Sequence, residues 1–358
     1  MQRSKSKILI IVFLTCVLVF LGAWVGLFYP RQIMPLGQNV EVLTPDSCKY
    51  HNDCLHPCIR FEASSSCYYM VQSPWYQSRD SIENPIFYQS RDLLSWTEGY
   101  VLAETPRYGY NSDPNLYLTS DNQIFCIWRE VNTPHCDSLN VQTALRGGKV
   151  INNQVCEVYD YAYSFEASVS TEIAPVILQR PNEEHYYIYF SWYQRVQPRQ
   201  SKGLAIWQGT SLTNPDFKLI DTVPIQSTYT VDKWKQLRLA NHLFFIPQRK
   251  WHDIWHFDLL EYYGDLYMIS CAEMDDNIML SKTEDWVNFT TYKMPLVNAH
   301  YTESQIGKRL YLYKPTAFIK NDSLHLFYSG NEQNSTENWR NRLYHTVKPM
   351  REILSELE

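Results

Sequence analysis

The sequence predicts an all-β fold, a five-bladed β-propeller preceded by an N-terminal transmembrane helix. Short runs rich in Tyr, Phe, Ile and Val recur between turn residues from about residue 50 onward, and helical patterns are scarce there. A short polar signature opens a strand in five successive units. A long apolar run without charged residues stands near the N-terminus. These patterns indicate a repeat architecture of strands attached to a membrane.

The apolar run "ILIIVFLTCVLVFLGAWVGLFY" covers residues 8–29. Its 22 residues suffice to cross a hydrocarbon core of about 30 Å, and they exceed the roughly 7–15 apolar residues of a cleaved signal peptide. We therefore expect an uncleaved signal anchor rather than a cleaved leader. Because Arg3, Lys5 and Lys7 precede it, we expect residues 1–7 in the cytoplasm and the remainder in the periplasm, a lumen or the extracellular space.

The charge of the exported part excludes one class of partner. Three of the 32 basic residues lie in the cytoplasmic tip, which leaves 29 against 38 acidic residues, a net charge of minus nine. A nucleic-acid-binding surface requires the opposite sign. We expect no nucleic acid partner.

Cysteine usage favours disulfides, because the exported part contains an even number of cysteines. These cysteines are Cys48, Cys54, Cys58, Cys67, Cys126, Cys136, Cys156 and Cys271. A metal site is the rival interpretation of "SCKYHNDCLHPC" (residues 47–58), but structural zinc sites use two Cys pairs and only Cys54 and Cys58 have suitable spacing. We expect disulfides of unassigned connectivity, no metal and no cofactor.

The strand-opening signatures define the domain organisation. They are His56-Pro57, Asp113-Pro114, Ala174-Pro175, His256-Phe257-Asp258 and Lys314-Pro315. Successive signatures are 57, 61, 83 and 57 residues apart, a repetition typical of propeller blades. We expect a proline-containing stalk over residues 30–47, the propeller over residues 48–347 and a C-terminal helix over residues 348–358. Residues 222–250 lengthen the third interval and carry a weak helix pattern.

Three segments carry a resemblance to a known group. The stretches "YYMVQSPWY...ENPIFYQSRDLLSW", "YNSDPNL...WRE" and "WHFDLL" resemble the five-bladed propeller glycoside hydrolases of the family 43 type, which include arabinanases, xylosidases and arabinofuranosidases. They are most similar to uncharacterised bacterial and phage members of that clan. The resemblance covers about residues 50–346 and implies a carbohydrate ligand at the mouth of the central axis.

The resemblance also implies site residues. Glycosidases of this type place two carboxyl groups beside the scissile bond, with an Asp base in blade one, a second Asp in blade two and a Glu acid in blade three. Here His56 occupies the blade-one position, and Asp113 matches the blade-two Asp. Glu172 is the candidate acid, although it stands three residues before Pro175 instead of two.

Other residues near the signatures offer substitutes. Glu83 in "IENPIF" and Glu130 in "WRE" lie at strand ends, so a catalytic pair of Asp113 with either of them is our expectation. His56 and His256 are expected to donate hydrogen bonds to sugar hydroxyls or to relay protons.

Substrate-binding residues are expected beside this pair. They are His56, His256, Asp258, Arg129, Trp75 and Trp192, of which the two Trp residues follow second strands in "SPWYQ" and "SWYQR". Aromatic rings suit the faces of sugars, but they also fill interfaces between blades. Asp113 is equally a usual turn former before proline.

These patterns predict a membrane-anchored, exported propeller that acts on a polysaccharide or oligosaccharide. The alternative is a propeller that binds a glycan without catalysis, which the missing blade-one Asp favours. A scaffold for protein contacts is a third interpretation.

Overall fold

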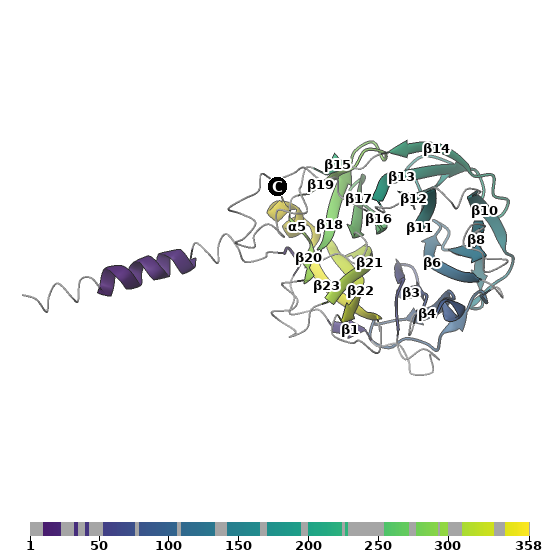
Figure 1. Cartoon of the computed structure of the whole chain (residues 1–358). Coiled ribbons are helices and arrows are strands. Elements are labelled where there is room, and N and C mark those ends of the chain that lie inside the picture. The colour runs from purple at the N-terminus through teal and green to yellow at the C-terminus, as the bar shows by residue number, and fades with distance from the viewer. Residues whose placement is uncertain are drawn as a thin grey trace, which may run out of the picture.

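The computed structural model confirms the five-bladed propeller, and Figure 1 shows its sheets arranged around a common centre. The structure describes residues 10–22, 32–34, 40–42, 53–75, 79–105, 109–132, 142–164, 170–194, 200–223, 226–227, 254–271, 277–292, 294–299, 310–332 and 341–357. The helix pattern expected within residues 222–250 lies outside these ranges.

Five inner strands form a closed ring around the axis. They are β2 (Cys58–Glu62), β6 (Gly109–Leu118), β11 (Ser170–Gln179), β16 (His256–Tyr262) and β21 (Leu310–Lys320). Each contacts the next in this order, and β21 contacts β2 again. Side chains on the axial face of one inner strand can therefore meet side chains from all the others.

Outward from each inner strand, neighbouring strands pair antiparallel, except that β15 (Gln226–Ser227) pairs parallel with β19 (Thr290–Thr291) in the fourth blade. The first blade continues with β3 (Cys67–Gln72), β4 (Ile86–Ser90) and β5 (Tyr100–Val101). The second continues with β7 (Ile124–Asn132), β8 (Gln142–Ile151), β9 (Gln154–Val155) and β10 (Tyr159–Ser164). The third continues with β12 (Tyr186–Gln194), β13 (Gln200–Gly209) and β14 (Lys218–Val223). The last two continue with β17 (Asp265–Cys271), β18 (Asn277–Thr283), β19 (Thr290–Thr291), β15 (Gln226–Ser227), β20 (Val297–Asn298); and β22 (Ser323–Glu332), β23 (Asn341–Pro349).

The N-terminal part of the chain completes the fifth blade. Strand β1 (Val40–Val42) pairs antiparallel with β23, so the last sheet holds strands from both ends of the chain. Ile33 and Met34 are buried beside the fourth and fifth blades, where helix α5 (Met350–Leu357) also packs. This pairing fixes the ends of the ring to each other and covers an edge that would otherwise expose unpaired backbone groups.

Apolar side chains fill the space between neighbouring blades. In the described residues, five clusters of buried apolar side chains each join one blade to the next. Alternate residues of one strand serve opposite interfaces: Tyr187 and Tyr189 face the fourth blade, and Ile188 faces the second. Each fully buried side chain of this size stabilises the fold by about 1.5–3 kcal/mol.

Three inner strands carry a β-bulge at the X-Pro signature. The register shifts between Ser112 and Asn115 in β6, between Ile173 and Val176 in β11, and next to Pro315 in β21. Proline has no N–H to donate to the ladder, so a bulge accommodates it.

The disulfide expectation is wrong for four of the described cysteines. Cys58, Cys67, Cys126 and Cys156 are unpaired thiols. Three of them are buried within the blades, where a thiol packs as a small apolar group. Cys48 and Cys136 lie outside the described residues.

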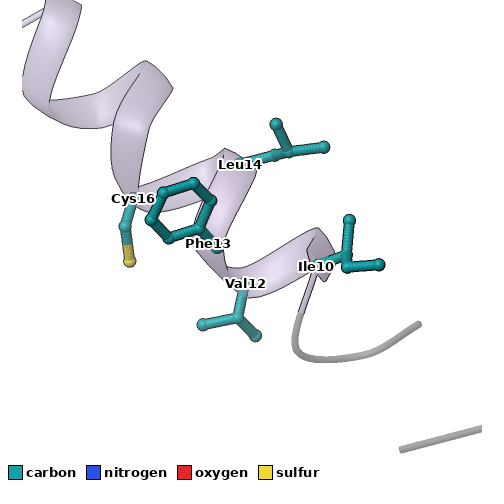
Figure 2. Close-up of a pocket in the computed structure, with 5 residues that line it drawn as sticks. All are labelled: Ile10, Val12, Phe13, Leu14 and Cys16. Atoms are coloured by element: carbon teal, nitrogen blue, oxygen red, sulfur yellow. The ribbon is translucent and has the colours of Figure 1, made fainter. Parts of the chain in front are cut away.

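Residues 10–22 form a helix whose apolar side chains are exposed. Figure 2 shows Ile10, Val12, Phe13, Leu14 and Cys16 projecting from it. Within the described residues, no helix combines the length and the apolar character needed to cross a membrane.

Four aromatic rings stack on one face of the fifth blade. His325 lies against Phe318 with ring centroids 4.8 Å apart, and His345 lies against Phe327 at 4.0 Å. The two imidazoles contact each other, with 3.2 Å between Nδ1 of His325 and Nε2 of His345. Burial lowers the pKa of each histidine to about 4.

We predict that this stack makes stability depend on pH. Both histidines have a folded-state pKa below the unfolded value of about 6.5, so the unfolded state binds more protons and stability falls as pH drops from about 6.5 to about 4. Melting temperatures measured at pH 7 and pH 5 should differ less in a His325→Phe/His345→Phe variant than in the wild type. His185→Phe, outside the stack, is the control, and an unchanged difference in the double variant would contradict the prediction.

Candidate functional site

Four titratable side chains meet where the inner strands begin. His56 precedes β2, Asp113 lies on β6, His256 opens β16, and Glu83 follows the short helix η3 (Asp80–Ile82) of the first blade. Their side chains are only 1–6% exposed. We call His56, Glu83, Asp113 and His256 the mouth cluster.

Asp113 is the centre of the mouth cluster. It stands at the bulge of β6 with a φ of 52°, a left-handed conformation in which few residues other than Gly, Asn and Asp are found. The conformation turns its carboxylate toward several donors. Oδ1 lies 2.7 Å from Nε2 of His256 and 3.5 Å from Nε2 of His56. Oδ2 accepts hydrogen bonds from Nε of Arg129 at 3.0 Å and from the hydroxyl of Ser112 at 3.1 Å.

His56 links the two carboxyl groups of the cluster. Its Nδ1 lies 3.2 Å from Oε1 of Glu83 and 2.8 Å from the hydroxyl oxygen of Ser73, whereas its Nε2 faces Asp113. Glu83 is held by the loop that carries it, since its carbonyl accepts the backbone N–H of Asn111 at 2.9 Å. The first blade therefore delivers a carboxyl group and an imidazole to the start of the second blade's inner strand.

Aromatic groups from the fourth and fifth blades orient His256. Its ring meets the Tyr313 ring edge to face at 4.5 Å, and the indole N–H of Trp255 donates to the Tyr313 hydroxyl at 2.8 Å. Nδ1 of His256 is buried and has no hydrogen-bond partner in the part of the chain that the structure describes.

Burial dominates the electrostatics of the mouth cluster. Burial raises the pKa of Glu83 well above its usual value, and the neighbouring Asp113 carboxylate raises it further. Burial opposes the charge on Asp113 as well, but His56, the positive Arg129 and the hydrogen bond from His256 hold its pKa well below the usual value. Burial lowers the pKa of His56, and it lowers that of His256 to about 4. The resting cluster thus combines an ionised Asp113 with neutral imidazoles.

Lys314 lies beneath the mouth cluster. Its side chain is 1% exposed, and its Nζ donates to the carbonyl of Pro114 at 3.3 Å. Burial lowers its pKa, although the Asp113 charge opposes that shift. Lys314 stands in the fifth signature at the position that Asp113 takes in the second, so the repeat itself places a cation and an anion at equivalent bulges.

Asp258, two residues after His256 on β16, is surrounded by hydrogen-bond donors from other inner strands. It receives two hydrogen bonds from the guanidinium of Arg60, both at 2.7 Å. The Thr316 hydroxyl donates to it at 2.6 Å and the Ala317 backbone N–H at 3.1 Å. These donors occupy both of its oxygens.

Not every expected residue reaches the mouth cluster. The structure brings together Asp113, Glu83, His56, His256 and Arg129. Glu130 instead pairs with Arg146 at 2.9 Å, because side chains alternate along β7 and Arg129 takes the face toward Asp113.

Three further expected residues have other surroundings. Trp75 is half-buried, and its indole donates to Asp80 at 2.9 Å. Trp192 packs against the core between the second and third blades. The Glu172 backbone pairs with Trp192, and its side chain lies outside the described part of the structure.

Five residues that lie beside the mouth cluster or Asp258 were not predicted as site residues from the sequence: Ser73, Ser112, Tyr313, Lys314 and Arg60. Lys314 was already within a recognised signature, so its register with Asp113 was a usable signal. Tyr313 precedes it, as Ser112 precedes Asp113. Nothing in the local sequence distinguishes Ser73 or Arg60.

Comparison with known proteins shows the fold. No protein-family profile and no curated protein matches the sequence. An N-acetylgalactosamine deacetylase from F. plautii, in complex with blood group B trisaccharide, has a similar structure (TM-score 0.63, 13% identity, 92% of this chain and 97% of that one).

Two glycosidases are also similar in structure. One is an α-L-arabinofuranosidase from Lactobacillus brevis (TM-score 0.55, 9% identity, 82% and 90% of the two chains). The other is a thermostable family-43 glycoside hydrolase (TM-score 0.51, 10% identity, 82% and 88%). The fold implied by the sequence resemblance is confirmed.

We predict that Asp258 stabilises the folded protein. In Asp258→Asn, the Arg60 guanidinium stays buried without an anionic partner, which should cost about 3–5 kcal/mol and lower the melting temperature by several degrees. The matched control is Asp265→Asn, which removes an exposed partner of Lys282 and should cost at most about 1 kcal/mol. Equal losses of stability in the two variants would contradict the prediction that the pair between Arg60 and Asp258 stabilises the fold more than an exposed pair does.

Proposed function

We propose that this chain is a hydrolase that acts on a carbohydrate at the mouth of the propeller axis. The observation that carries the proposal is the mouth cluster, in which two carboxyl groups and two imidazoles from three inner-strand regions and one loop converge. The structurally similar proteins named above act on sugars, according to their descriptions, and this supports a carbohydrate as the substrate class.

The geometry favours Glu83 with His56 as the group that moves a proton. The 3.2 Å contact between Oε1 of Glu83 and Nδ1 of His56 forms a carboxyl–imidazole pair, the usual equipment for activating a water molecule. Arg129 and the Tyr313 hydroxyl supply a positive charge and a donor for an oxyanion beside that pair.

The contacts of Asp113 bear on which bond the proposed hydrolase would break. Cleavage of a glycosidic bond uses two carboxyl groups that both face the sugar. Asp113 directs one oxygen to the two histidines and the other to Arg129 and Ser112, so Glu83 is the less engaged carboxyl of the described cluster. This arrangement favours hydrolysis of an acyl group carried by a sugar over hydrolysis of a glycosidic bond.

A glycan-binding propeller without catalysis is the second candidate. The ion pair between Asp113 and Arg129 favours it, because a carboxylate already neutralised by a guanidinium can serve as a fixed acceptor for sugar hydroxyls. The mouth cluster would then recognise a glycan without breaking a bond.

We also propose that residues 8–29 anchor the protein in a membrane and place the propeller on its outer side. The described helix, residues 10–22, supports this because it contains no charged residue and exposes large apolar side chains such as Phe13 and Leu18, at 67% and 68%. Such a surface is stable in a lipid environment or against other apolar surfaces.

We predict that Glu83→Gln lowers turnover by about 100-fold or more, because an amide cannot exchange a proton with His56. The full-length protein in detergent is incubated with acetylated oligosaccharides, polysaccharides and aryl glycosides, and released acetate and aglycone are measured. Glu130→Gln is the matched control. Acetate release that survives only in the control supports deacylation. Aglycone release with the same pattern would instead assign glycosidase activity, and binding without any turnover would support the second candidate.

We predict that the full-length protein stays in the membrane fraction after extraction with alkaline carbonate. A Leu14→Arg/Leu18→Arg variant should be released, because each charge at the centre of a span costs about 2.5–3.5 kcal/mol. Arg351→Leu, on the exposed face of α5, is a control for altered hydrophobicity. Release of the wild-type protein by carbonate would refute the anchor.

A further inference from the structure

Three side chains of the mouth cluster have the composition of a metal site. His56, Asp113 and His256 are all buried, and one potential ligand atom from each lies within 4.8 Å of the others. We propose that His56, Asp113 and His256 bind one divalent transition-metal ion of the Zn²⁺ type, with positions left open toward the mouth. Binding of the ion does not depend on the reaction proposed above.

The distances between the ligand atoms suit such an ion. Metal–nitrogen and metal–oxygen distances of about 2.0–2.2 Å place neighbouring ligand atoms about 3.0–3.5 Å apart in octahedral or tetrahedral geometry. Oδ1 of Asp113 lies 3.5 Å from Nε2 of His56 and 2.7 Å from Nε2 of His256. One of these distances is at the upper end of that range and the other is slightly below it, and the three potential ligand atoms lie within 4.8 Å of one another, so the side chains must shift to reach coordination distance.

The groups that contact the other polar atoms of the ligands are also those expected around a metal site. In metal sites, the second nitrogen of a ligating histidine usually contacts a carboxylate or another acceptor, which fixes the ring. Nδ1 of His56 has Glu83 at 3.2 Å and Ser73 at 2.8 Å in that position. Arg129 holds Oδ2 of Asp113, which leaves Oδ1 to face the ion as a single-oxygen ligand.

The orientation of the two imidazoles favours a cation between them. Both histidines direct Nε2 at the same carboxylate oxygen, Oδ1 of Asp113, so all three potential ligand atoms face one point. Nδ1 of His256 lacks a partner in the described part of the chain, although it is buried. An ion between the three side chains would accept both Nε2 lone pairs, and Nδ1 would become the N–H of the ring, free to bond a water or a ligand.

The ligand set selects the class of ion. Two imidazoles and one carboxylate suit Zn²⁺ and neighbouring transition metals, whereas Ca²⁺ and Mg²⁺ prefer oxygen ligands. Three protein ligands leave at least one position for water, as in catalytic sites. The guanidinium of Arg129 lies nearby, so an anionic fourth ligand such as hydroxide or a substrate oxyanion would also meet a positive charge.

Metal binding is tested on the full-length protein after treatment with EDTA. The protein is titrated with Co²⁺ and with Zn²⁺ by calorimetry, and the Co²⁺ form is followed by visible absorption, which reports the coordination geometry. We expect one equivalent per chain, a higher melting temperature with the ion, and a loss of affinity of about 100-fold or more in His256→Gln and in His56→Gln. His185→Gln is the matched control and should bind as the wild type does.

The outcomes separate the metal site from the proposed activity. A wild-type protein that binds no stoichiometric ion and shows no shift in melting temperature would overturn the site, and so would full affinity in both histidine variants. If either variant does not fold, anomalous X-ray scattering at the Zn edge from the wild type decides whether the ion lies between these side chains. Ion binding without turnover on any sugar would leave the site standing and reject the hydrolase.

Discussion

The bidentate ion pair between Arg60 and Asp258 is the interaction on which the centre of the propeller depends. The two residues come from the first and fourth blades, and Thr316 of the fifth blade donates to the same carboxylate. Arg60 also donates to the carbonyl of Leu116 in the second blade. One pair therefore joins four of the five inner strands. A ring of strands closed only by apolar faces could slide; a bidentate pair on the axis fixes how the strands meet.

The mouth cluster depends on that alignment. His256 and Asp258 are two residues apart on β16, so both point toward the axis, about 7 Å apart along it. When Asp258 is held by Arg60, His256 is held at a fixed height opposite Asp113. The bulge of β6 then turns the Asp113 carboxylate toward His256, with the left-handed backbone stabilised by the hydrogen bonds that converge on its side chain. The stabilising ion pair and the mouth cluster thus lie next to each other along the same axis.

Much of this could be predicted from sequence because it follows from repetition. The recurring signatures located the inner strands, and convergence of their starts brought His56, Asp113 and His256 to one place. The pairing of Arg60 with Asp258 could not be predicted, since the partners are 198 residues apart and no pattern connects them. Glu130 lies away from the mouth cluster for a local reason: it adjoins Arg129, and neighbouring residues of a strand face opposite sides.

The proposed metal site has no local sequence signature, because its ligands are far apart in the chain. In a propeller, ligands come from different blades, and the separation along the chain is set by the blade length. His56, Asp113 and His256 are each near the start of an inner strand, and that shared position is the signal that spacing rules do not contain.

The charges at the axis indicate how a ligand must enter. Arg60 is neutralised by Asp258 and Arg129 by Asp113, whereas Lys314 and Glu83 belong to neither of these two ion pairs. Burial shifts the pKa of Lys314 down and that of Glu83 up, so both are moved toward their uncharged forms. The mouth cluster with Arg129 is therefore close to electrically balanced, and both oxygens of Asp113 are already engaged. A sugar or an ion that binds there must replace existing hydrogen bonds with better ones, so the site should select ligands by geometry and charge more than by apolar contact.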